Sequence, residues 1–244
     1  METTNIDRAR DLIIRARSVF VLTGAGISAE SGIPTFRGTD GLWKNYSTTD
    51  LATPEAFKNN PTLVWEWYHW RQRIISQAQP NPAHQAIVQL EKHAERFLLL
   101  TQNVDGLHVR AGSKNVLELH GNIFRARCLL CGATLRHLPP DTEQESDLPR
   151  CTCGGLLRPD VVWFGETIPQ DIWHTALTFL TKTEVAIICG TSGVVWPAAS
   201  IPEIARHEGI ATIEVNLEPT GISTMVDVSI QGKAGKLLPQ LLHN

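Results

Sequence analysis

Residues 18–38 read SVFVLTGAGISAESGIPTFRG, an apolar run that passes into a glycine turn and then into small polar residues. The spacing Gly24-x-Gly26-x-x-Ala29 fits a dinucleotide-binding fingerprint, in which one glycine makes the tight turn and the next lets the backbone approach a pyrophosphate. The small third residue lets a helix pack on the strand. An isolated match is also typical of a plain strand-to-helix turn. The pattern therefore favours an α/β fold that binds a dinucleotide.

The acidic residue that usually accompanies this fingerprint, about 20 residues further along the chain, is not evident. Asp40 follows the glycine turn too closely, and Asp50 does not follow an apolar strand. In ordinary dehydrogenases that acid holds a ribose hydroxyl of the nucleotide. The sequence therefore disfavours a standard dehydrogenase, although the glycine turn still predicts a dinucleotide.

Length and composition narrow the class further. The 244 residues exceed the roughly 100–200 of a typical domain, so we expect one main domain with a smaller insertion. The net charge of −3 gives no electrostatic footprint for nucleic acid. No window approaches the ~20 apolar residues of a membrane span, so we expect a cytoplasmic location and no membrane partner. In that reducing compartment the five cysteines are expected to be metal ligands or buried thiols.

Four short apolar runs predict buried parallel strands, at residues 19–22, 97–100, 185–189 and 211–215. The runs end in TGAGIS, TQNVDGLH, GTSG and NLE, which carry side chains suited to ribose, amide and phosphate groups. Loops are polar in most proteins, yet in a doubly wound sheet these four would meet at the carboxyl edge, where ligands bind. A fifth strand near residues 226–230 and a closing helix over GKAGKLLPQLL would complete a Rossmann-like parallel sheet.

Two segments depart from this alternation and predict a smaller zinc-ribbon plus helical domain. Residues 61–78 predict a tryptophan-rich helix, and residues 128–158 carry four cysteines. The expected Rossmann dinucleotide-binding domain comprises residues 1–37, 80–122 and 159–244. The expected small domain comprises a helical module at 38–79 and a zinc-binding module at 123–158.

The four cysteines form two close pairs separated by nineteen residues, Cys128-x-x-Cys131 and Cys151-x-Cys153. A glycine directly follows each pair, as the tight turns of a zinc ribbon require, although the second pair is shorter than the common Cys-x-x-Cys. Four unrelated buried cysteines are the alternative. Four thiolates would complete a tetrahedral shell, so the predicted zinc is structural and not catalytic. Cys189, in IICGTS, is interpreted as a core thiol.

His120 lies in LELHGN, after a predicted short strand and on the crossing between the two expected domains. A lone histidine is more often structural than catalytic. Clefts form where domains meet, and the pKa range of histidine suits a general base near neutral pH. We therefore interpret His120 as a candidate base, whereas the other eight histidines have no comparable setting in the sequence.

These motifs together resemble the sirtuins, a family of NAD-dependent protein deacylases that pairs a Rossmann domain with a small zinc-and-helix domain. The resemblance spans nearly the whole chain in order. It rests on GAGISAESGIPTFRG at 24–38, TQNVDGLH at 101–108, LHGN at 119–122, the paired cysteines, VVWFGE at 161–166, GTSG at 190–193 and VNLE at 215–218.

The resemblance implies a role for each matching residue. The expected pyrophosphate contacts are Gly24, Ala25, Gly26 and Ser28; the expected cofactor-loop residues are Phe36 and Arg37. The nicotinamide half would contact Gln102, Asn103 and Asp105, and the adenosine half Gly190, Thr191, Ser192, Asn216 and Glu218. The other cofactor contacts would be Ile27, Glu30, Thr35, Trp43, Val104, Leu217 and Ala234. Acyl-lysine would lie against Val162, Phe164 and Gly165.

In the mechanism that the resemblance implies, the acyl oxygen attacks the nicotinamide ribose and displaces nicotinamide, which needs orientation more than acid catalysis. His120 would then act as general base for the ribose hydroxyls, with Asn103 and Asp105 completing the catalytic set. The products would be free lysine and O-acyl-ADP-ribose, so NAD is consumed and no hydride moves. This chemistry accounts for the missing dehydrogenase acid.

The tryptophan-rich helix carries a charge inside its apolar stripe. On a helical wheel Leu63, Trp67, Trp70 and Ile74 form one arc that continues through Val64 and Ile75. Arg71 falls within that arc, with Tyr68 at its edge, and a buried guanidinium needs an anionic partner. A carboxylate elsewhere in the fold, or snorkelling, is one explanation. However, Tyr68-x-x-Arg71 resembles the pair of the sirtuin class that removes acidic acyl groups, in which the ligand's carboxylate is the partner.

The sequence thus predicts a deacylase that removes succinyl and malonyl groups, and acetyl groups as well, from protein lysines. ADP-ribosyl transfer to protein is a second hypothesis that uses the same cofactor. A noncatalytic NAD or zinc-binding module is a third, which the motif around His120 disfavours.

Overall fold

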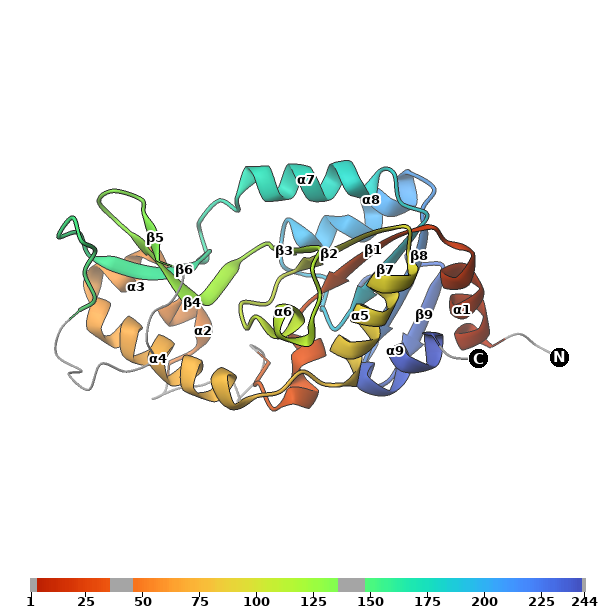
Figure 1. Ribbon diagram of the computed structural model, residues 1–244, viewed down its shortest axis with the longest axis horizontal. Coiled ribbons are helices and arrows are strands. Elements are labelled where there is room, and N and C mark those ends of the chain that lie inside the picture. Colours follow the sequence, from red (N-terminus) through yellow and green to blue (C-terminus); the bar gives the residue numbers. More distant parts are fainter. Residues whose placement is uncertain (1–3, 36–45, 136–147, 243–244) are drawn as a thin grey trace.

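The computed structural model describes residues 4–35, 46–135 and 148–242. Two sheets organise them, a six-stranded sheet in the larger part of the molecule and a three-stranded sheet in the smaller part (Figure 1). The larger sheet is parallel throughout, with the order β3-β2-β1-β7-β8-β9. Its strands are β1 (Ser18–Thr23), β2 (Arg96–Thr101), β3 (Val116–Glu118), β7 (Val185–Cys189), β8 (Ala211–Asn216) and β9 (Val228–Gln231). These bounds confirm the predicted strands to within two residues.

Helices cover both faces of the larger sheet. The helices α1 (Asn5–Arg15), α5 (Pro82–His93) and α9 (Ala234–Leu242) share a core with Val19 and Val21 of β1. The helices α7 (Gln170–Leu180) and α8 (Ile201–His207) share the opposite core with Phe20 and Leu22. Successive strand residues point to opposite faces, so a strand between two helical layers is buried on both sides and favours apolar residues throughout. This is why β1 reads as a continuous apolar run.

The smaller part combines an antiparallel sheet with three helices. The sheet has the order β5-β4-β6, formed by β4 (Gly121–Cys128), β5 (Thr134–Leu135) and β6 (Leu157–Val161). The helices are α2 (Thr48–Leu51), α3 (Pro54–Asn59) and α4 (Pro61–Gln77), and they share one hydrophobic core with the sheet. The division into a larger and a smaller part matches the predicted fold class. The residue boundaries of the domains stay a prediction.

The buried face of α4 differs from the predicted arc. Leu63, Trp70 and Ile74 are only half-buried, whereas Tyr68, expected at the edge, is completely buried together with Arg71. The helix contacts both β4 and β6, and it also forms part of a cavity wall. An apolar arc marks only the side that faces a hydrophobic core. The cavity wall, which includes Tyr68 and Arg71, therefore shifted the buried face away from the prediction.

Short elements complete the chain. The 3-10 helix η1 (Ala25–Ser31) follows β1, where the fingerprint predicts a helix, and α6 (Leu107–Ala111) follows β2. A second 3-10 turn, η3 (Ala198–Ser200), leads into α8. Among the described residues, the helices are all too short or too polar to cross a membrane.

Candidate active site

A cavity of about 790 Å³ lies where the two parts meet. Its walls come from the segments that follow β1, β2, β6, β7 and β8, and from α2 and α4. The carboxyl ends of parallel strands are where ligands of open α/β sheets bind. The predicted gathering of strand-end residues at one sheet edge is thus confirmed.

Most residues named from the sequence line this cavity. From the cofactor set they are Gly24, Ala25, Gly26, Glu30, Thr35, Gln102, Asn103, Val104, Gly190, Thr191, Ser192, Asn216, Leu217, Glu218 and Ala234. His120 and the predicted substrate residues Tyr68, Arg71, Val162, Phe164 and Gly165 line it as well. Phe36, Arg37 and Trp43 lie outside the described residues.

Three predicted residues lie behind the wall and do not line the cavity. Ile27 is part of the hydrophobic core. The hydroxyl of Ser28 donates to Asp105 Oδ2 at 2.7 Å and accepts from the side-chain amide of Asn103 at 3.2 Å. Asp105 Oδ1 accepts from the backbone N–H of Leu107 at 2.9 Å, and burial raises the pKa of this carboxyl. Ser28 and Asp105 therefore hold the Asn103 side chain in place from beneath.

The glycine turn after β1 packs directly against the turn after β7. The backbone N–H of Gly26 donates to the carbonyl of Gly190 at 2.8 Å, and a Cβ on Gly26 would lie 2.7 Å from that oxygen. A side chain at either position would push the two turns apart. The close packing of the two turns therefore requires a glycine at position 26. This requirement adds to the predicted approach of a pyrophosphate.

Side-chain amides connect the loops that form the cofactor half of the wall. Gln102 Nε2 donates to Thr191 Oγ1 at 3.0 Å, and Asn216 Nδ2 donates to the Thr191 carbonyl at 2.8 Å. These two bonds join the segments after β2, β7 and β8. The polar residues at the three strand ends therefore form one connected surface that faces the cavity.

The ring of His120, the candidate base, is held by one hydrogen bond to the backbone. It follows β3 and precedes β4, so it lies on the crossing between the two sheets, as predicted. Its Nδ1 lies 3.0 Å from the carbonyl of Gln102, and because a carbonyl only accepts, Nδ1 carries the proton. Burial lowers the pKa of His120, although the hydrogen bond to Gln102 opposes this. At neutral pH the imidazole is therefore uncharged, and the lone pair on Nε2 can accept a proton.

Tyr68 and Arg71 form a polar spot in a buried wall. Tyr68 is 0% exposed and Arg71 is 8% exposed. The guanidinium lies 4.7 Å from the ring centroid of Trp67 and 5.7 Å from that of Tyr68. Burial lowers the pKa of Arg71 to about 10, against the weaker attraction of Tyr68 and Asp105. Arg71 therefore keeps its positive charge at neutral pH.

Sequence reasoning missed several residues of the wall. They are Thr48, Ala52, Val161, Trp163, Glu166, Ile168, Val195, Trp196, Val215, Pro219, Thr220, Gly232 and Lys233. Trp163 and Glu166 lie within VVWFGE, and Val195 and Trp196 follow GTSG directly. Their position inside or next to these motifs was the signal that could have found them.

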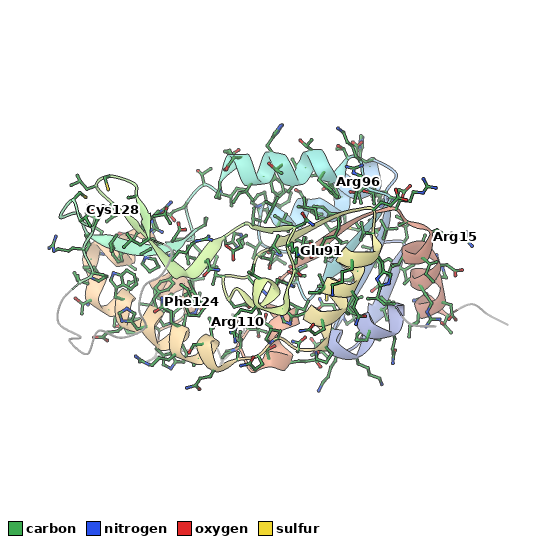
Figure 2. All side chains as sticks on the ribbon, viewed as in Figure 1. Arg15, Glu91, Arg96, Arg110, Phe124 and Cys128 are labelled. Carbon is green, nitrogen blue, oxygen red and sulfur yellow. The ribbon has the colours of Figure 1, made fainter. Side chains whose placement is uncertain are left out.

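The four paired cysteines come together at the outer end of the smaller part, where Figure 2 labels Cys128 at the opposite end of the molecule from Arg15. Their Sγ atoms all lie within 4.8 Å of one another, and Cys131 Sγ lies 3.7 Å from Cys151 Sγ and 3.5 Å from Cys153 Sγ. Four sulfurs at about 2.3 Å from a tetrahedral zinc would be about 3.8 Å apart. The cluster therefore fits a closed structural zinc site.

The fold and the cavity define a two-part α/β protein with a dinucleotide-type sheet edge and a four-cysteine metal cluster. Residues 24–197 match the Sir2 family, and the chain belongs to that family.

Related proteins agree with this assignment. An NAD-dependent protein deacylase 2 of Pyrobaculum aerophilum is 53% identical over 234 residues, which cover 96% of this chain and 93% of that protein. The crystal structure of a Sir2 homologue–NAD complex is 46% identical with a TM-score of 0.90, covering 96% of this chain and 91% of that one. A Sir2–p53 peptide–NAD⁺ structure is 32% identical with a TM-score of 0.87, covering 99% and 98%.

Proposed function

We propose that this NAD-dependent protein deacylase removes succinyl and malonyl groups, and also acetyl groups, from protein lysine side chains. The observation that carries the acyl preference is the buried pair Tyr68 and Arg71, which lines the same cavity as His120. Membership of the Sir2 family supports the reaction class, and the structure of a relative with a peptide and NAD⁺ supports a peptide substrate.

The residues of the cavity fit NAD. Amide side chains of Gln102, Asn103 and Asn216 supply donors and acceptors for carboxamide and ribose groups, and Glu218 supplies an acceptor for hydroxyls. NAD, when bound, supplies an ADP-ribosyl group that is activated by its nicotinamide leaving group. The connected strand-end surface holds such a ligand against the sheet edge.

His120 supplies the base. Its neutral imidazole, fixed through Nδ1 by the Gln102 carbonyl, can take a proton at Nε2 from a ribose hydroxyl. The backbone carbonyl of His120 accepts from the Val162 N–H at 2.9 Å, which ties the base to the segment that carries the predicted acyl-lysine contacts. This hydrogen bond therefore holds the proposed base next to the segment that carries the predicted acyl-lysine contacts.

Arg71 supplies the charge that selects the acyl group. A fixed cation on an otherwise largely apolar wall attracts a ligand carboxylate strongly, since the pair is shielded from water. The Tyr68 hydroxyl, on the same helix three residues earlier, adds a hydrogen bond. Succinyl and malonyl groups end in a carboxylate, whereas an acetyl group has none. The proposed preference follows from that difference.

Kinetics on peptides of one sequence that carry succinyl-, malonyl- or acetyl-lysine test the proposal. For Arg71→Met we expect KM for the succinyl peptide to rise about 10- to 150-fold, since a charge-assisted hydrogen bond contributes roughly 1.5–3 kcal/mol. Acetyl-peptide turnover should hold or improve because the pocket becomes more apolar. Tyr68→Phe should show the same pattern more weakly.

One outcome of these kinetics would contradict the proposed acyl preference. Equal losses on both substrates, together with a lower melting temperature, would show that Arg71 only has structural partners within the fold. The acidic-acyl preference would then be wrong, although deacetylation by the same site would remain.

A further inference from the structure

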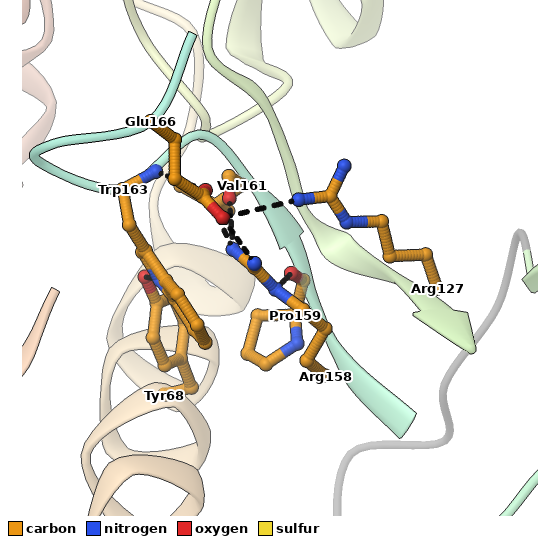
Figure 3. Close-up of polar contacts among 7 residues, drawn as sticks. All are labelled: Tyr68, Arg127, Arg158, Pro159, Val161, Trp163 and Glu166. Carbon is orange, nitrogen blue, oxygen red and sulfur yellow. Dashed lines mark hydrogen bonds and ion pairs between the residues drawn. The ribbon is translucent and has the colours of Figure 1, made fainter. Parts of the chain in front are cut away.

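An indole ring lies between the acyl-pocket tyrosine and a buried ion pair. Trp163, in the segment after β6, is 2% exposed, and its Nε1–H donates to the hydroxyl oxygen of Tyr68 at 2.8 Å (Figure 3). Its backbone N–H donates to Glu166 Oε2, also at 2.8 Å. Both groups of Trp163 that can donate a hydrogen bond are thus occupied, one of them by the proposed selectivity residue.

Arg158 holds the indole in place. Its guanidinium carbon lies 3.3 Å from the centroid of the Trp163 ring, and the ring of Phe57 lies 5.2 Å from the same indole. Arg158 is 4% exposed on its side chain, and it donates through both terminal nitrogens to the Glu166 carboxylate (Figure 3). It also donates to the backbone carbonyl of Val161 at 2.9 Å. The charge of Arg158 is therefore neutralised by Glu166, and its guanidinium stacks on the indole ring.

The direction of the bond between Trp163 and Tyr68 is fixed by chemistry. An indole N–H is a donor only, so the phenol oxygen must accept. The hydrogen of the Tyr68 hydroxyl takes no part in this bond and can be donated to another group. Since Tyr68 lines the cavity, a ligand carboxylate there can accept this hydrogen.

We propose that Trp163 is a positioning residue for the recognition of acidic acyl groups, because its indole N–H orients the Tyr68 hydroxyl to donate to the acyl carboxylate. The inference rests on the proposed function, and it adds a selectivity residue that does not itself bind the carboxylate. The ion pair of Arg158 and Glu166 supports the indole in this role.

The experiment compares two buried tryptophans. Trp163→Phe removes the N–H that reaches Tyr68 and keeps an aromatic ring. The matched control is Trp65→Phe on α4, since Trp65 is equally buried at 2% and its Nε1–H donates to the backbone carbonyl of Leu157 at 3.1 Å. The readout is the ratio of kcat/KM for succinyl to acetyl peptide, which a general loss of stability leaves unchanged.

For Trp163→Phe we expect the ratio to fall about threefold to tenfold, mainly through KM for the succinyl peptide, as the loss of one neutral hydrogen bond predicts. Trp65→Phe should leave the ratio at the parent value even if its melting temperature falls. In the double variant with Tyr68→Phe, the ratio should equal that of Tyr68→Phe alone, because both changes remove the same donor to the carboxylate.

A shape-matched replacement separates the hydrogen bond from packing. Incorporation of β-(3-benzothienyl)alanine at position 163 puts sulfur in place of the N–H within a ring of nearly the same shape. If this protein folds and keeps the parent ratio, the inference is overturned, whatever Trp163→Phe does. Failure of the proposed function is distinguished because Arg71→Met would then change activity on succinyl and acetyl peptides equally and leave their ratio unchanged.

Discussion

Two buried histidines should make the protein sensitive to mild acid. His84 on α5 and His108 on α6 are both fully buried, with ring centroids 4.8 Å apart. His84 Nδ1 accepts from the backbone N–H of Asn81, and His108 Nε2 lies 2.9 Å from the hydroxyl of Thr23. The other ring nitrogens, His84 Nε2 and His108 Nδ1, have no hydrogen-bond partner among the described residues. A proton added to either ring would create a charge with no nearby counter-ion in this network.

The sign and size of the effect follow from the pKa values. Burial lowers the pKa of His84 to about 4, and burial together with His84 lowers that of His108 to about 3. In the unfolded chain the pKa of both histidines is near 6.5. Below this pH the unfolded state therefore binds protons that the folded state does not bind. Stability is therefore fully present above pH 6.5 and falls as the pH decreases toward 4. At pH 5 each histidine should lower the free energy of unfolding by about 2 kcal/mol.

Equilibrium urea unfolding at pH 7.5, 6.0 and 5.0 measures this loss. His108→Gln keeps a donor for Thr23 but cannot titrate, so the decrease between pH 7.5 and 5.0 should shrink by about 2 kcal/mol relative to the parent. The exposed residue His174 provides a matched control, and His174→Gln should leave the decrease unaltered. An identical decrease in the parent and in His108→Gln would refute the reasoning.

Two further predictions concern the metal and the base. Cys128→Ser should lower zinc content, measured by elemental analysis, and the melting temperature together, since binding energy in such sites is folding energy; a metal-free variant with full stability and activity would contradict the zinc site. His120→Ala should abolish deacylation of peptides, measured by mass spectrometry, while zinc content and melting temperature hold. Deacylation at the parent rate would show that another group is the base.

The larger sheet could be predicted because its strands are buried on both faces. β1, β2 and β7 each contain a continuous apolar run, and the polar residues at the ends of such a run mark where the strand begins and ends. The smaller sheet was not predicted strand by strand. β5 has only two residues and β4 mixes buried with half-buried positions, so neither shows a clear period of two. Cysteine spacing located that region without giving its strands.

The site could be predicted where function coincides with the end of a strand. Asn103, Thr191 and Asn216 follow strands of the larger sheet or end one, and all three line the cavity. Sequence reasoning did not single out His84 and His108, which the structure buries side by side. Their burial depends on how α5 and α6 pack on the sheet, and no local pattern in the sequence reports it.

Two arginines show where sequence reasoning reaches its limit. Arg71 attracts notice because it interrupts an apolar arc on a helix, whereas Arg158 lies in LLRPD with no such pattern around it. Both prove to be buried beside aromatic rings in the same region. Arg158 is paired with Glu166 and stabilises the indole, while Arg71 contributes its guanidinium to the cavity wall. A buried guanidinium selects a ligand only if it lies at the cavity surface, and that distinction comes from geometry.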